Sequence, residues 1–170
     1  ISGFGTPKAA LFIVTQATAD GTAADHAQLM VGATDGTNQW AAAMTSENGL
    51  TTTDEFTGQS TAACVNILDP AGGSADGVAA FSAWITNGVR INWSNAPASA
   101  YLMTVVLFGG DDLSAFAGNF DMHDTVGSAV IVTGVGFRPT DLITVKNGAT
   151  STHRPIAVGV VHDESGTESQ

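Results

Sequence analysis

The chain has 170 residues, of which 44% are hydrophobic and only 12% are charged, and it carries a formal net charge of −11. This length predicts one domain or slightly more, with enough apolar residues for a core. The 16 acidic and 5 basic residues argue against nucleic acid and anionic membrane surfaces as partners, since both are bound mainly through Lys and Arg. No apolar run approaches the roughly 20 residues of a membrane-spanning helix, so membrane insertion is not expected.

Short runs of Val, Ile, Thr, Phe and Trp, separated by Gly, Asn, Asp and Pro, predict an all-β chain. The expected strands span residues 8–15, 27–33, 39–45, 61–68, 78–86, 89–94, 100–108, 128–135, 141–146 and 155–161. Residues 38–44 also fit one helical turn, but their alternating pattern favours a strand. Residues 111–116 are a candidate short helix. Strands at a spacing of about ten residues predict a two-sheet antiparallel β-sandwich of jelly-roll type rather than a solenoid.

The clearest turn signal is Asn87-Gly88, which lies between two β runs and predicts a type I′ hairpin. A two-residue loop at this site sets the register of the hairpin. The predicted pairs are Thr86 with Val89, Trp84 with Ile91, and Ser82 with Trp93. This register places both tryptophans on the core face. The later run at residues 101–108 is apolar at odd and even positions, which predicts a central strand covered on both faces or a strand at a subunit interface.

The start of the chain recurs near its end. Gly3-Phe4 is followed by Pro7 and an apolar run, and Gly136-Phe137 is followed by Pro139 and a second apolar run. Each copy then reaches a Val-Gly pair, at residues 31–32 and 158–159. The period of about 130 residues is that of an ordinary domain. We therefore expect a sandwich unit at 1–131 and a partial repeat at 132–170, which packs on the sandwich or is donated to a neighbour. Since the chain starts at Ile1 rather than Met, we expect it to be either processed or part of a longer polypeptide, and the repeat favours the second interpretation, an array of such units.

Reactive clusters are scarce in the sequence. Cys64 stands alone in an apolar run, which predicts a buried residue and excludes an intrachain disulfide. Histidine stands next to aspartate at His26, His123 and His162, but neighbours on a strand point to opposite faces and do not form a dyad. Asp111 and Asp112 are weak candidates for Ca²⁺, the one cofactor considered, because loop carboxylates suit this ion. Plain solvated turns are the alternative.

Two features relate to glycans. Trp40 is a candidate for stacking on a sugar ring, since the hairpin register assigns Trp84 and Trp93 to the core; core packing is the alternative for Trp40 as well. Asn92-Trp93-Ser94 matches the acceptor pattern for N-glycosylation.

Two stretches resemble segments of known proteins. Residues 87–101 with 107–110, and residues 135–142, resemble parts of poorly characterised β-sandwich proteins encoded in phage and prophage structural regions. The resemblance implies a virion surface, tail or fibre component. No catalytic or binding motif accompanies it, so it implies no site residues.

These observations predict a structural protein without enzymatic activity, located extracellularly or on a virion surface. Its partners would be copies of itself, in a particle, fibre or filament. An incomplete repeat leaves apolar strands in need of a partner, so strand addition between neighbours would bury Leu142, Val145 and Ile156. The alternative is a lectin-like carbohydrate-binding module, with Ca²⁺ as a candidate cofactor, which would use Trp40 to bind surface glycans. An enzyme ranks last.

Overall fold

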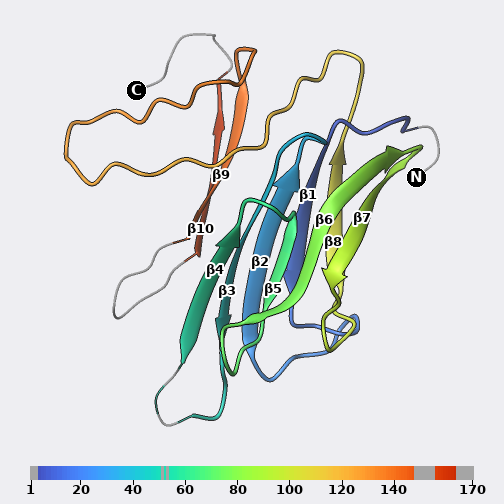
Figure 1. Cartoon of the computed structure of the whole chain (residues 1–170), viewed down its shortest axis with the longest axis vertical. Coiled ribbons are helices and arrows are strands. Elements are labelled where there is room, and N and C mark those ends of the chain that lie inside the picture. The colour runs from blue at the N-terminus through green and yellow to red at the C-terminus, as the bar shows by residue number, and fades with distance from the viewer. Residues whose placement is uncertain (1–3, 51, 53, 148–155, 164–170) are drawn as a thin grey trace.

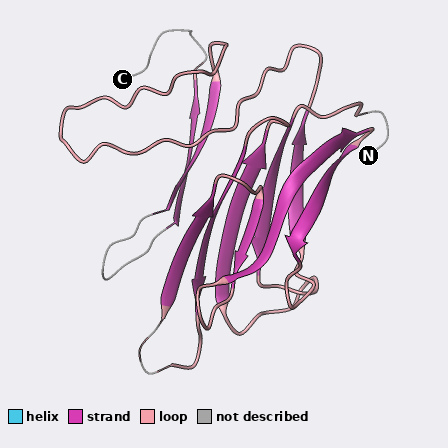
Figure 2. Ribbon diagram, viewed as in Figure 1, coloured by secondary structure: helices cyan, strands magenta, loops and turns pink. Residues whose placement is uncertain are grey.

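The computed structural model describes residues 4–50, 52, 54–147 and 156–163, and within them the chain forms ten strands and no helix (Figure 2). The strands are β1 (Ala9–Thr15), β2 (Ala27–Thr34), β3 (Gln39–Ser46), β4 (Glu55–Ser60), β5 (Val65–Leu68), β6 (Ala75–Ile85), β7 (Gly88–Asn95), β8 (Met103–Phe108), β9 (Asp141–Asn147) and β10 (Ile156–His162). The all-β prediction is confirmed. The stretch at 39–45 is a strand, and the candidate helix at 111–116 is absent.

Two antiparallel sheets pack face to face (Figure 1). One has five strands in the order β4-β3-β2-β1-β8, and the other has three in the order β5-β6-β7. β9 and β10 pair only with each other, in a separate two-stranded sheet. Because β1 to β4 follow one another across the large sheet, this part is a simple meander. The architecture is consistent with a β-sandwich, and the finer jelly-roll type stays a prediction.

The core lies between the two sheets and follows from alternation along the strands. In β1, the side chains of Ala10, Phe12 and Val14 are at most 2% exposed, while the residues between them are only partly buried. All four residues of β5 are buried, because this short strand lies over β2 and β3. Apolar side chains of the small sheet, including Trp84, pack against this cluster from the other side.

Gly32 in β2 lets the two sheets approach closely. A Cβ atom at this position would lie only 2.0 Å from the carbonyl oxygen of Cys64. Cys64 itself is fully buried, as its apolar surroundings predicted, and burial raises the pKa of its thiol to about 11. The residue is therefore a packing element with an unreactive thiol.

The β6–β7 hairpin is shifted by one residue from the predicted register. Ile85 pairs with Gly88, so the loop residues are Thr86 and Asn87. Asn87 takes the positive φ of 60°. Its side chain accepts hydrogen bonds from the amides of Phe4 and Gly5, and its own amide donates to the Gly5 carbonyl. This contact with the N-terminal segment fixes Asn87 as the second loop residue, whereas local turn preference predicted it as the first.

The shifted register also changes the neighbours of the tryptophans. Trp84 pairs with Val89 rather than Ile91, and its ring centroid lies 4.7 Å from that of Phe81. Trp93 pairs with Ala79 and remains 38% exposed, so its assignment to the core was wrong. The pairing of β6 with β7 shifts register between Phe81 and Ala83, so the pairs on either side of this point do not follow one continuous register.

Three further strand predictions were wrong in part. Residues 128–135 form no strand, because no other strand lies beside them. The run at 101–108 becomes β8, which is an edge strand of the large sheet rather than a central one. Strand β4 was not predicted, because its sequence is largely polar. It forms a strand through its pairing with β3. Residues 148–155 and 164–170 of the predicted repeat, including His153, lie outside the described residues.

We expect Gly32→Ala to lower the free energy of unfolding by about 2 to 3 kcal/mol, because overpacking at a backbone contact forces the sheets apart. Urea unfolding followed by far-UV circular dichroism measures this. Gly159→Ala is the matched control, since Gly159 also follows a valine but is exposed. A Cβ there meets only the Thr144 hydroxyl, which can rotate. Equal losses in the two variants would contradict the close-packing role of Gly32.

Candidate assembly surface

Apolar side chains are distributed unevenly along the chain. Every buried hydrophobic residue of the described part except Ala117 lies between Ala10 and Ala79. By contrast, fifteen of the eighteen exposed large hydrophobic side chains lie after residue 101. Single exposed apolar residues are ordinary, but a series of them in one region indicates an interaction surface. The C-terminal part of the chain is therefore the candidate site.

The β9–β10 hairpin contributes the first part of this surface. Its seven antiparallel pairs run from Asp141 with His162 to Asn147 with Ile156. Polar contacts close its open end: His162 Nδ1 lies 2.6 Å from Asp141 Oδ1, and the Arg138 guanidinium lies 3.3 Å from the Asp163 carboxylate. The hydrogen bond with His162 lowers the pKa of Asp141. The hairpin is thus internally complete although it joins neither large sheet.

The predicted interface residues fall on two faces of this hairpin. Val145 and Ile156 share one face, because Val145 pairs with Val158 and Ile156 lies two residues before Val158. Leu142 lies on the opposite face, beside Val161. Leu142 is 49% exposed, while Val145 and Ile156 are partly buried.

Three more exposed residues on the Val145 face were missed: Ile143, Val158 and Val160, with exposures of 39%, 56% and 70%. The alternation of apolar residues at 143, 145, 156, 158 and 160 was the signal that could have identified them. The hairpin therefore exposes a more extensive apolar face than the three predicted residues suggested.

The hairpin sits beside the sandwich rather than within it. β9 approaches β3 and β4, at one side of the five-stranded sheet. Figure 1 shows β9 and β10 standing apart from the two packed sheets. Most apolar side chains of the hairpin stay exposed beside the sandwich, and only Val145 and Ile156 are partly buried.

The connection from β8 to β9 is the second part of the surface. The start of this connection is held by Lys8, whose ammonium group donates hydrogen bonds to the carbonyls of Asp111 and Leu113 at 2.8 and 2.9 Å. Further on, the Ala117 amide donates to the Asp35 carboxylate at 2.9 Å. Beyond this anchor the chain extends outward past β9 and β10 (Figure 1). Residues 118–140 contain no strand and several exposed apolar residues, among them Phe120, Met122 and Ile131.

Asp35 stabilises this anchor electrostatically. Burial alone would raise the pKa of Asp35, but hydrogen bonds from the backbone amides of Asn38, Ala117 and Thr37 hold it below its ordinary value of 3.8. The carboxylate lies at the turn between β2 and β3. The ionised carboxylate therefore ties the long connection to the end of the sandwich, and protonation weakens this tie.

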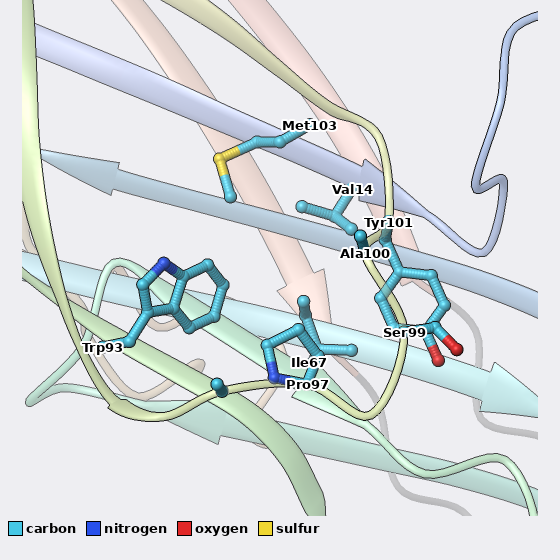
Figure 3. A pocket seen from close by; sticks show the side chains of 9 residues that line it. Val14, Ile67, Trp93, Pro97, Ser99, Ala100, Tyr101 and Met103 are labelled. Carbon is cyan, nitrogen blue, oxygen red and sulfur yellow. The ribbon is translucent and has the colours of Figure 1, made fainter.

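The third part is the open edge between β8 and β7. A cavity of about 290 Å³ lies at the start of β8 and is lined mainly by apolar side chains. Figure 3 shows Trp93 and Tyr101 at its two sides, with Ile67 and Pro97 between them. Burial, together with the nearby charge of Asp76, raises the pKa of Tyr101, whose hydroxyl lies 3.4 Å from the Asp76 carboxylate. The cavity can accept an apolar or aromatic group.

Several predicted site residues lie away from these three parts. Trp40 is partly buried on the face of β3 that points away from β5. Asp111 and Asp112 are exposed after β8, and the described residues include no group of three His, Cys, Asp or Glu placed to hold a metal ion. Asn92 is exposed on β7, and its use as a glycan acceptor stays a prediction. His26 Nδ1 accepts a hydrogen bond from the Asn48 amide.

Comparison with protein-family models, with curated proteins and with solved structures finds no match to this chain. The resemblance to phage and prophage β-sandwich proteins therefore stays a prediction. Within the described ranges, no helix is long and apolar enough to cross a membrane.

We expect acid to release the connection from the sandwich. Because the pKa of Asp35 is lower in the folded chain, its stabilisation is complete above pH 3.8 and is lost as the pH falls through the folded pKa. Hydrogen exchange at the Ala117 amide should accelerate over this range, beyond the intrinsic pH effect. Asp35→Ala, which removes the acceptor, should show fast exchange throughout. If the exchange in this variant kept the wild-type pH dependence, Asp35 would not be the anchor.

Proposed function

We propose that this protein is a non-enzymatic assembly subunit of an extracellular particle or fibre, such as a virion surface, tail or filament component. It acts through β-mediated contacts with copies of itself. The observation that carries this proposal is the accumulation of exposed apolar residues after residue 101, in a chain whose fully buried apolar side chains, apart from Ala117, all lie between Ala10 and Ala79. Such a surface is costly in water and is stable when a partner covers it.

The strand pairing of the C-terminal hairpin supports its kinship with the start of the sandwich. Phe12 pairs with Gly32 in β1–β2, and Thr144 pairs with Gly159 in β9–β10. Phe12 and Thr144 each stand five residues after a proline, and each of the two glycines follows a valine. The two hairpins thus have the same register relative to the repeated sequence, as expected if 132–170 is a partial repeat of the N-terminal third.

The two hairpins differ in what covers them. The backbone carbonyl of Cys64, the residue just before β5, lies directly over Gly32. Gly159, by contrast, is exposed. β9–β10 therefore resembles the first hairpin of a sandwich that lacks its covering sheet. A neighbouring copy is the natural source of that cover, because each copy carries a sheet of the kind that covers the β1–β2 hairpin.

Energetics are compatible with this role. Burial of a Val, Leu or Ile side chain contributes about 1.5 to 3 kcal/mol, so the apolar face of the hairpin offsets a substantial part of the cost of association. The net charge of −11 opposes contact between copies. Since salt screens this repulsion, association should strengthen as ionic strength rises.

We expect Val160→Asp to weaken self-association at least tenfold, because it places a charge on the exposed apolar face of the hairpin, at a side chain that is 70% exposed. Sedimentation velocity over a protein concentration series measures the effect. Val126→Asp is the matched control: it makes the same exchange at a fully exposed site outside the hairpin. Wild-type protein that stays monomeric at high concentration and high salt would refute the assembly function. Equal weakening in both variants would show that net charge, rather than the hairpin, controls association.

A carbohydrate-binding module is the second candidate, because an exposed aromatic ring borders a cavity. Trp93 is 38% exposed and lines this cavity with Tyr101, which makes it a better stacking platform than the partly buried Trp40. The nearby Asp76 carboxylate, which lies within reach of the Tyr101 hydroxyl, could accept hydrogen bonds from a sugar.

If this candidate is right, wild-type protein binds defined glycans on an array and Trp93→Ala reduces that binding at least tenfold. Trp40→Ala then serves as the comparison, with binding unchanged. Removal of Ca²⁺ by a chelator tests whether the ion contributes. An array without signal for the wild-type protein would eliminate the lectin-like function.

A further inference from the structure

We propose that residues 128–135 of one copy add as a strand to the free edge of β8 in a second copy. The proposal rests on the assembly function above and specifies how the subunits join. It assigns a donor and an acceptor within this chain, so that association extends the five-stranded sheet of each neighbour. Peptide segments commonly bind exposed sheet edges in this way.

The donor has a strand-forming sequence without a strand. Residues 128–135 contain four consecutive β-branched residues, at 130–133, and no charge. Val130, Ile131 and Val132 are 40%, 80% and 43% exposed. No hydrogen bond in the described part of the chain involves the backbone of residues 129–135. A run of this composition gains both backbone hydrogen bonds and apolar contact by pairing with a sheet edge.

The acceptor is the least protected edge of the sandwich. β8 pairs with β1 on one side only, and its six residues include no charge and no proline. Val105 and Val106, which point to opposite faces of β8, are 40% and 39% exposed. Natural edge strands are usually short, irregular or charged, since these features prevent pairing with other chains.

The other sandwich edges do carry such protection. β7 contains Arg90 and has two register shifts against β6. β5 has only four residues, and all of them are buried. β4 contains Glu55 and is approached by β9. β8 is therefore the edge at which an incoming strand meets neither charge, irregularity nor cover.

The cavity at the start of β8 adds a specific contact to this edge. Met103, the first residue of β8, lines the cavity together with Trp93 of β7. A strand that pairs with β8 runs along the opening between the two sheets. One of its apolar side chains can then enter the cavity and contact the exposed Trp93 ring (Figure 3).

The positions of donor and acceptor determine the type of assembly. β8 forms one edge of the five-stranded sheet, and the connection that contains the donor extends beyond the side of β4, the other edge (Figure 1). The bond between Ala117 and Asp35 and the approach of β9 to β3 and β4 hold it on this side. A donor on one side and an acceptor on the other give head-to-tail contacts, which form open filaments or rings rather than twofold dimers.

Two variants test the halves of this contact. Ile131→Pro disables the donor, because proline removes an amide and disrupts strand pairing. Val106→Lys disables the acceptor by placing a charge on its edge. Each has a matched control at an exposed site: Asn119→Pro lies in the same connection, and Gln59→Lys lies on β4, at the other edge of the same sheet. Far-UV circular dichroism establishes that each variant keeps the β fold.

The expected result is that the wild type and both controls form oligomers that grow with concentration, whereas the donor and acceptor variants are monomers. Mixed in equal amounts, the two variants form a dimer and nothing larger, because one intact donor meets one intact acceptor. Amides 129–134 gain protection from hydrogen exchange in this dimer. Sedimentation velocity and exchange mass spectrometry provide these readouts.

The contradicting outcomes are separable. If the wild type assembles and both variants assemble equally well, the strand addition is wrong while the assembly function stands. If Gln59→Lys blocks association and Val106→Lys does not, β4 is the acceptor and the proposal fails. If the wild type remains monomeric under all conditions, both proposals fail. Protection of amides 129–134 in that monomer would show that the segment pairs within its own chain.

Discussion

The contact between Gly32 and the backbone at Cys64 determines how the two sheets lie against each other. Because no side chain separates them there, β5 can settle onto β2 and β3, and all four of its residues become buried. This brings Val65 and Ile67 against Phe12 and Met30, the largest buried side chains of the other sheet. The closeness of the sheets also explains the small residues on the inner face of β3, where Ala41 and Ala43 are buried. A tightly packed interior of this kind has no room for further elements.

The consequence for the rest of the chain is that its apolar residues find no place in that core. After β8, the connection and the β9–β10 hairpin carry Val, Ile, Leu, Phe and Met side chains that remain exposed. The polar contacts of this region, at Asp35, Arg138 and Asp141, position its backbone without covering its apolar groups. A folded unit with a complete core and a separate apolar extension is suited to association with its own kind. The low share of charged residues, 12%, makes the remaining surface compatible with such contacts.

Local pattern predicted much of the fold. The all-β class, the antiparallel pairing and the positions of β1, β2, β3, β9 and β10 follow from runs of β-forming residues between turn residues. The burial of Cys64 follows from its apolar neighbours. Errors arose where a distant segment decided the outcome. Asn87 is held by the N-terminal residues Phe4 and Gly5, which moves the turn by one position and leaves Trp93 at the rim of a cavity.

The sequence by itself determined which segments can be strands and which positions on them are apolar, because alternation and turn preference act over a few residues. It also indicated an apolar hairpin near the C-terminus through Leu142, Val145 and Ile156. Only the tertiary structure decided which strands lie at an edge, which face of the hairpin is exposed, and that residues 128–135 pair with no other strand. These depend on which strands become neighbours, and that choice is made by the packing of the whole sandwich, since each strand can pair only where another leaves an edge free.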